Sequence, residues 1–138
     1  MTRNLYRITA VIFVLFAAGH TFGFLTFKPP TPEAAAVLSS MHSVHFSDGS
    51  GSYSLGDFYV GFGLSISVNM LFFAFLSWQL ASLSHMKALA PLAWGFFALQ
   101  LPAVVLGWIY FGLPPAIFST VVAVLLGWAA RSLSKGKS

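Results

Sequence analysis

The sequence predicts an all-α membrane protein: a bundle of four transmembrane helices, with a short extracytoplasmic interfacial helix between the first two spans. Three observations lead to this fold class. The 138 residues are 57% hydrophobic, and only 7 basic and 3 acidic residues are present. Four stretches are each apolar for about 20 residues, the length that a helix needs to cross about 30 Å of hydrocarbon. Prolines lie at the ends of these stretches. Lipid therefore surrounds most of the protein, as one membrane domain covering residues 1–138.

The four spans are expected at about 5–27, 58–83, 88–111 and 115–133. Pro29 and Pro30 end the first span, because proline cannot continue a helix. Pro91 suits the first turn of the third span, and Pro114 and Pro115 suit the start of the fourth. The proline positions therefore agree with the apolar pattern.

The first span has a second interpretation, a cleavable signal peptide, since two arginines precede an apolar run that reaches Ala17 and Ala18. Phe16, however, occupies a position where cleavage requires a small residue. The apolar run also continues to Phe27. We therefore expect the first span to be retained in the membrane.

The basic residues predict the orientation of the chain. With four crossings, Lys28 falls on one side of the membrane and the other bases fall on the opposite side. Basic residues mark the cytoplasmic side. Both termini are thus expected on the cytoplasmic side of the membrane, and the long connection 28–57 is expected on the outer face. The six bases assigned to the cytoplasm are Arg3, Arg7, Lys87, Arg131, Lys135 and Lys137.

The connection holds a predicted helix over residues 31–46. Thr31 can cap this helix, and Pro32 suits its first position. At helical spacing His45 falls in the middle of the apolar face and His42 falls at its edge. The helix is expected to lie at the membrane interface. The following stretch SDGSGS is expected to form a flexible turn.

The second span carries a stripe of small and polar residues that we call the polar stripe: Asp57, Gly61, Ser65 and Asn69. These residues recur every four positions, so they share one face of a helix, and that face is expected to turn away from lipid. Close packing against another helix would explain the stripe, and so would a polar path leading into the membrane. For Asp57 alone, capping of the helix is the simpler explanation.

Two further polar residues lie inside the predicted spans. His20 is placed about 10 Å below the outer boundary, counting 1.5 Å per residue from Phe27. Ionisable side chains at such depth face the interior of a bundle, either hydrogen-bonded to a neighbouring helix or in a functional site. Gln100 lies near mid-membrane at the level of Asn69, and the two amides are expected to form an interhelical clamp.

Several functions are disfavoured by the sequence. The chain has no cysteine, which excludes disulfides, iron–sulfur clusters and covalently attached haem. The bases do not form an aromatic-studded patch, which argues against nucleic acid. No cofactor is predicted. His42 and His45 are the residues from which a metal site could be built together with His20 or Asp57, but their HSVH spacing is not diagnostic and no metal is predicted.

The stretches FAAGHTFGF, VHF, DFYVGFGL, WGFFALQLP and LLGWAA together resemble a group of small, uncharacterised four-span bacterial membrane proteins. The likeness covers nearly the whole chain. It implies a four-helix bundle in the cytoplasmic membrane and no particular activity. In size and span number the chain is also loosely similar to DoxX-like proteins, which implies an accessory role near redox or lipid metabolism.

Three functions remain open. The first is binding of a lipid, quinone or isoprenoid-like molecule in an outward-facing intramembrane pocket. The second is acid–base chemistry on an isoprenoid- or sterol-like substrate, with His20 as the acid or base and Asp57 orienting it. The third is a structural subunit of a homo-oligomer or membrane complex, held through small-residue faces such as the one that the fourth span carries at intervals of four, Ser119, Ala123 and Gly127. Binding is favoured because no complete set of nucleophile, base and orienting residue is present. The residues expected to line the pocket are His20, His45, Asp57, Ser65, Asn69 and Gln100.

Overall fold

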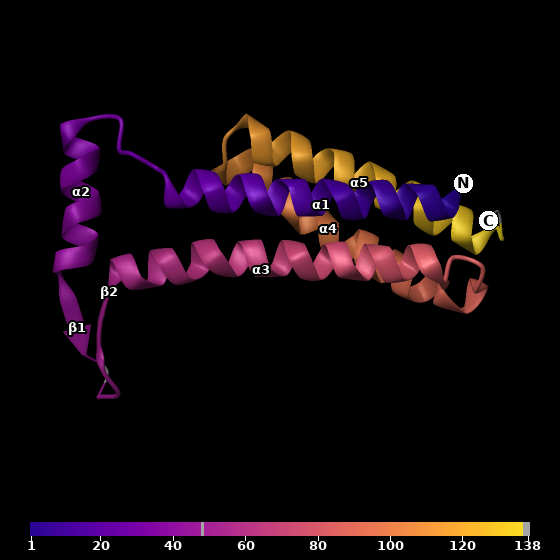
Figure 1. Ribbon diagram of the computed structural model, residues 1–138, viewed down its shortest axis with the longest axis horizontal. Helices are drawn as coiled ribbons and strands as arrows, with labels where there is room; N and C mark the ends of the chain where they lie inside the picture. Colours follow the sequence, from indigo (N-terminus) through magenta and orange to yellow (C-terminus); the bar gives the residue numbers. More distant parts are fainter. Residues whose placement is uncertain (48, 137–138) are drawn as a thin grey trace. The chain divides into compact units, whose positions relative to one another are not determined.

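A computed structural model describes residues 1–47 and 49–136 (Figure 1). Within these residues the chain forms five α-helices, one short 3-10 helix and two short strands. In chain order the elements are α1 (Thr2–Leu25), α2 (Pro32–Ser43), β1 (His45–Ser47), β2 (Ser52–Ser54), α3 (Leu55–Ser82), η1 (Lys87–Leu89), α4 (Ala90–Tyr110) and α5 (Leu113–Ser134).

The predicted all-α membrane fold is confirmed. The helices α1, α3, α4 with η1, and α5 are each long and apolar enough to cross a membrane, with mean hydropathies of 1.8 to 2.0 in their most apolar windows. Only 17% to 39% of each window is buried inside the protein. Apolar helices that expose most of their side chains require an apolar solvent. By length and composition this is a multi-pass membrane protein.

The chain divides into two compact units, which are described separately. The first contains residues 1–16 and 71–138, and we call it the four-helix unit because it includes part of every long helix. The second contains residues 17–70, and we call it the hairpin unit.

Phe13 of α1 is at the centre of the four-helix unit. Its side chain is 1% exposed. Its ring centroid lies 5.7 Å from that of Phe73 on α3, 6.1 Å from Phe96 on α4 and 5.7 Å from Phe118 on α5. One aromatic ring therefore contacts all three other long helices.

Small residues bring α4 and α5 close together. A side chain at Gly107 would meet the Ser119 hydroxyl at 3.0 Å and the Ala116 backbone at 3.3 Å. Ser119 and Ala123 are buried, and Gly127 lies against the Phe97 ring. This agrees with the small-residue spacing of the fourth span, because small side chains let helix backbones approach. Gly127 therefore already packs against a side chain of the same protein, Phe97.

In the hairpin unit, α2 begins as predicted. The Thr31 hydroxyl accepts a hydrogen bond from the Ala34 amide at 3.2 Å, and Pro32 is the first helical residue. Glu33 lies in the first turn, where its own backbone amide and the Thr31 side chain hold the pKa of the Glu33 carboxyl below its usual value. The N-terminal cap thus fixes where the helix starts.

The predicted end of this helix is wrong. The helix stops at Ser43, Val44 is extended, and His45 begins a strand. The reason is pairing: residues 45–47 form an antiparallel hairpin with residues 52–54. The β-branched and aromatic residues of VHF favour a strand when backbone partners are within reach. His45 is therefore exposed on a strand, and does not lie in the middle of an apolar helical face.

The stretch SDGSGS forms the hairpin turn, apart from Asp48, which lies outside the described residues. Gly49 has a φ of 89°, a backbone conformation that favours glycine. Phe46 and Tyr53 are directly opposite each other in the hairpin. The hairpin therefore presents two aromatic rings next to the start of α3.

Candidate functional site

The polar stripe on α3 does not face inward. Asp57, Gly61, Ser65 and Asn69 are all exposed. The buried residues of this part of α3 are instead Gly56, Gly63 and Ser67. Positions 65 and 67 differ by two residues, which is a rotation of about 200° around a helix. The inward orientation predicted for the stripe is therefore wrong, and the opposite face of α3 makes the contacts.

His20 contacts this opposite face. Its Nδ1 atom lies 3.1 Å from the Ser67 hydroxyl, and its ring is stacked on that of Phe24. The Thr21 hydroxyl is within hydrogen-bond distance of both the Ser67 hydroxyl, at 2.7 Å, and the Ala17 carbonyl, at 2.8 Å. The imidazole thus belongs to a small hydroxyl network between α1 and α3, and Ser67 is its partner.

A glycine makes room for this contact. The Phe24 ring lies against Gly63, where any side chain on α3 would collide with it. Phe24 also packs against Tyr59, with the ring centroids 5.2 Å apart. His20 and Phe24 are four residues apart on α1, and Gly63 and Ser67 are four apart on α3. Matching these two pairs in the sequence is the signal that would have identified the contacting faces.

Asp57 caps α3. Its Oδ2 atom accepts hydrogen bonds from the Ser54 amide at 2.7 Å and from the Ser54 hydroxyl at 2.8 Å. In return the Asp57 amide donates to the Ser54 hydroxyl oxygen at 3.1 Å. This reciprocal pattern is a capping box. Asp57 therefore does not orient His20, whose hydrogen bond goes to Ser67.

The exposed face of α3 nevertheless forms a groove, which we call the aromatic groove. It encloses about 380 Å³ and is lined by Tyr53, Asp57, Phe58, Gly61, Phe62 and Ser65. Phe58 is its central ring: its centroid lies 5.8 Å from Phe46, 6.4 Å from Tyr53 and 6.3 Å from Phe62. Three members of the polar stripe thus lie together, between aromatic side chains that sequence reasoning did not select.

The other two histidines of this unit lie nearby. The His42 ring lies against Gly56, and His45 Nδ1 is 3.1 Å from the Ser43 carbonyl oxygen. Both imidazoles interact electrostatically with Asp57. Across residues 1–47 and 49–136, no three His, Cys, Asp or Glu side chains gather closely enough to hold a metal ion.

The two amides predicted as a clamp are used differently. Gln100 is 5% exposed in the four-helix unit, and its Nε2 atom donates to the Ser119 carbonyl at 3.3 Å. Asn69, in the hairpin unit, is exposed. Gln100 therefore stabilises the pairing of α4 with α5, and the prediction of an Asn69–Gln100 clamp is not supported.

Comparison of this chain with protein-family models, with curated proteins and with solved structures gives no match.

Proposed function

We propose that this protein binds an apolar small molecule or lipid of the bilayer in the aromatic groove, as a binding or accessory protein rather than an enzyme. The main support is the lining of the groove, which combines the aromatic rings of Tyr53, Phe58 and Phe62 with one glycine and two polar residues. Sites for small molecules are mostly apolar, with a few polar groups that fix the orientation of the ligand.

Asp57 gives the groove its polar end. Both hydrogen bonds from Ser54 fall on Oδ2, so Oδ1 accepts a hydrogen from the ligand. This favours a ligand with a hydroxyl or amine group attached to an apolar ring or chain. An isoprenoid alcohol or a quinol has this chemistry. Because the carboxylate is held by the capping box, it needs no rearrangement to receive the ligand, which lowers the cost of binding.

The positions of the basic residues support an outward-facing location for the aromatic groove. Six of the seven basic residues fall on the side opposite Lys28, so the positive-inside rule places both termini in the cytoplasm. The aromatic groove, α2 and the hairpin then face the outer side of a bacterial inner membrane. Ligands reach the groove from the outer leaflet.

Gly61 offers a direct test. A side chain added at Gly61 would meet no atom within 4 Å, so Gly61→Leu fills the groove without disturbing the fold. Gly95 on α4 is the matched control, since it is also an exposed helical glycine with open space around it. Each protein is purified in mild detergent, and the bound small molecules are extracted and identified by mass spectrometry.

We expect the same apolar ligand to copurify with the wild type and with Gly95→Leu, and to be lost from Gly61→Leu. Equal amounts of ligand in all three proteins would show that it binds elsewhere. Loss from both variants would show that the substitutions act through the fold and would also contradict the proposal.

A further inference from the structure

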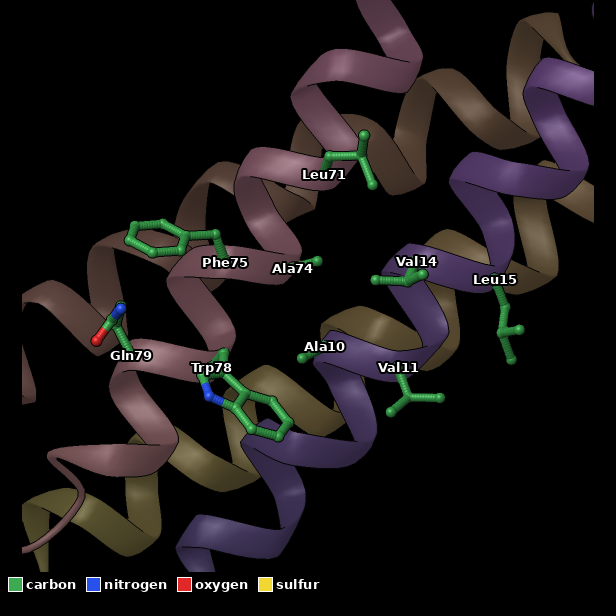
Figure 2. A pocket seen from close by; sticks show the side chains of 9 residues that line it. All are labelled: Ala10, Val11, Val14, Leu15, Leu71, Ala74, Phe75, Trp78 and Gln79. Atoms are coloured by element: carbon green, nitrogen blue, oxygen red, sulfur yellow. The ribbon is translucent and has the colours of Figure 1, made fainter.

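The four-helix unit contains a second apolar groove, between α1 and α3. It encloses about 440 Å³. Figure 2 shows Ala10 and Ala74 pointing toward each other across it, with the Trp78 indole reaching from α3 toward α1. Val11, Val14 and Leu71 line it further along. The small alanines leave the space, and the larger side chains form its walls. We call this the α1–α3 groove.

A separate polar pocket lies further toward the start of α1, in the same four-helix unit. The residues lining the groove on α1 recur at intervals of three or four, and the same face reaches Arg7 and then Arg3 and Asn4. On α3 the corresponding face continues to Ser82, the last residue of the helix, and His85 lies in the turn that follows. Arg3, Asn4, Ser82, Ser84 and His85 line a pocket of about 350 Å³.

Along α1, Arg7 lies between the residues that line the polar pocket and those that line the groove. Its guanidinium carbon is 5.6 Å from the centre of the Trp78 ring, a cation–π contact that fixes it at the end of the groove. Arg3 and Arg7 therefore share one face of α1 at the N-terminal side of the α1–α3 groove. Guanidinium groups bind phosphate oxygens with two hydrogen bonds at once.

The sequence of the four-helix unit contains no Asp or Glu. The three acids of the chain are Glu33, Asp48 and Asp57, all within residues 17–70. Six of the seven Lys and Arg residues belong to the sequence of the four-helix unit, the exception being Lys28. The charged side chains in the sequence of the four-helix unit are therefore all basic, apart from the histidine His85. The charge of this unit is complementary to an acidic lipid headgroup.

We propose that the α1–α3 groove binds an acidic phospholipid, with one acyl chain in the groove and the phosphate between Arg7 and Arg3. From Arg7 to Leu15 the groove can hold about 12 Å of acyl chain, at 1.5 Å per helical residue. The Trp78 indole lies where chain and headgroup meet, the position that tryptophan favours in membranes. The inference is independent of the function proposed for the aromatic groove and holds for either orientation of the chain.

The test compares two lipids that differ only in headgroup charge. The purified full-length protein is titrated in neutral detergent with phosphatidylglycerol or phosphatidylcholine of identical acyl chains, and native mass spectrometry counts the retained lipid. We expect preferential retention of phosphatidylglycerol. Arg7→Gln should weaken that retention about fivefold, the effect of one basic residue near an anionic lipid. Arg7→Lys, which keeps the charge but loses the paired hydrogen bonds of the guanidinium, should have an intermediate effect.

Matched variants separate the site from general charge. Lys135→Gln removes the same charge from an exposed position outside the groove and should leave retention unchanged. Val14→Phe narrows the groove and should lower the binding of both lipids, whereas Val105→Phe, at an exposed site on α4, should not. Glycerol 3-phosphate, which has the phosphate but no acyl chain, should not compete.

Three results would overturn the inference. The first is equal retention of the two lipids by the wild type. The second is an equal effect of Arg7→Gln and Lys135→Gln, which would indicate nonspecific attraction to the positive end. The third is displacement of phosphatidylglycerol by glycerol 3-phosphate, which would assign the polar pocket to a free phosphate. Loss of copurifying ligand from Gly61→Leu is a separate result and does not bear on this site.

Discussion

The four-helix unit and the hairpin unit differ in the interactions that stabilise each of them internally. Among the described residues, every buried hydrophobic side chain except Ala17 belongs to the four-helix unit. The hairpin unit instead has hydrogen bonds: Ser67 with His20 and Thr21, and Ser54 with Asp57. Its aromatic rings pack on one another while most remain exposed. Buried apolar packing is therefore the main feature of the four-helix unit, which also has hydrogen bonds such as that of Gln100 to Ser119, whereas the hairpin unit has little buried apolar surface beside its polar contacts.

This difference suggests a division of roles. A densely packed unit keeps one arrangement, since any change in a core side chain opens a cavity or creates a clash. A unit with few buried apolar contacts opens more easily, and binding sites are often drawn from such regions. We therefore expect the hairpin unit to be the more adaptable of the two units and the four-helix unit to be the more rigid one.

The largest effect is expected at Phe13. Phe13→Ala removes the ring that contacts Phe73, Phe96 and Phe118, and leaves a cavity at the centre of the four-helix unit. The free energy of unfolding should fall by about 3 kcal/mol, the lower end for a buried phenylalanine. Unfolding in mixed micelles followed by circular dichroism measures it. Phe22→Ala on the same helix is the control, because Phe22 is 72% exposed, and it should have little effect. Similar losses at both positions would mean that the core is not where we place it.

A smaller effect is expected at Ser54, in the hairpin unit. Ser54→Ala removes the hydroxyl of the capping box while leaving the Asp57 carboxylate in place. Loss of an N-cap destabilises a helix by about 1 kcal/mol. Amide hydrogen exchange in the first turn of α3 should accelerate accordingly. Ser52→Ala, at an exposed position in β2, should leave those amides unchanged. If hydrogen exchange also accelerated in the four-helix unit, the capping box would not act on the hairpin unit alone, and the proposed difference between the two units would be wrong.

The sequence predicted the four-helix unit better than the hairpin unit for a physical reason. Crossing a membrane requires a minimum apolar length, and proline limits where a helix can begin or end, so the spans follow from composition alone. All four long helices were placed to within a few residues. Buried Ser119 and Ala123 were also predicted to pack closely, since small residues at intervals of four permit it.

The orientation of α3 could not be predicted in the same way. In a soluble protein, apolar residues mark the buried face, but in lipid both faces of a helix are apolar. Small and polar residues occur on two faces of α3, one with Gly61 and Ser65 and the other with Gly63 and Ser67. Only their partners on α1 decide between them. The short hairpin was missed because its strands are three residues each, too short for an alternating pattern to appear.

The smallest predicted effect tests which face of α3 contacts α1, the one with Ser67 or the one with Ser65. Ser67→Ala removes the hydroxyl that joins His20 to Thr21, and hydrogen bonds between membrane helices contribute about 0.6 kcal/mol. Ser65→Ala is the matched control, because the Ser65 hydroxyl donates only to the Gly61 carbonyl of its own helix. The free energy of unfolding should fall for Ser67→Ala and stay nearly constant for Ser65→Ala. Combining Ser67→Ala with His20→Phe should cost less than the sum of the two single changes, since both remove the same bond.

The opposite ranking would have a wider consequence. If Ser65→Ala were the costly change, the polar stripe would face α1, and the aromatic groove, which includes Gly61 and Ser65, would be closed by protein rather than open to lipid. Gly61→Leu would then disturb the fold instead of blocking a ligand. The two serines, two residues apart on one helix, therefore decide whether a binding site exists on this side of the protein.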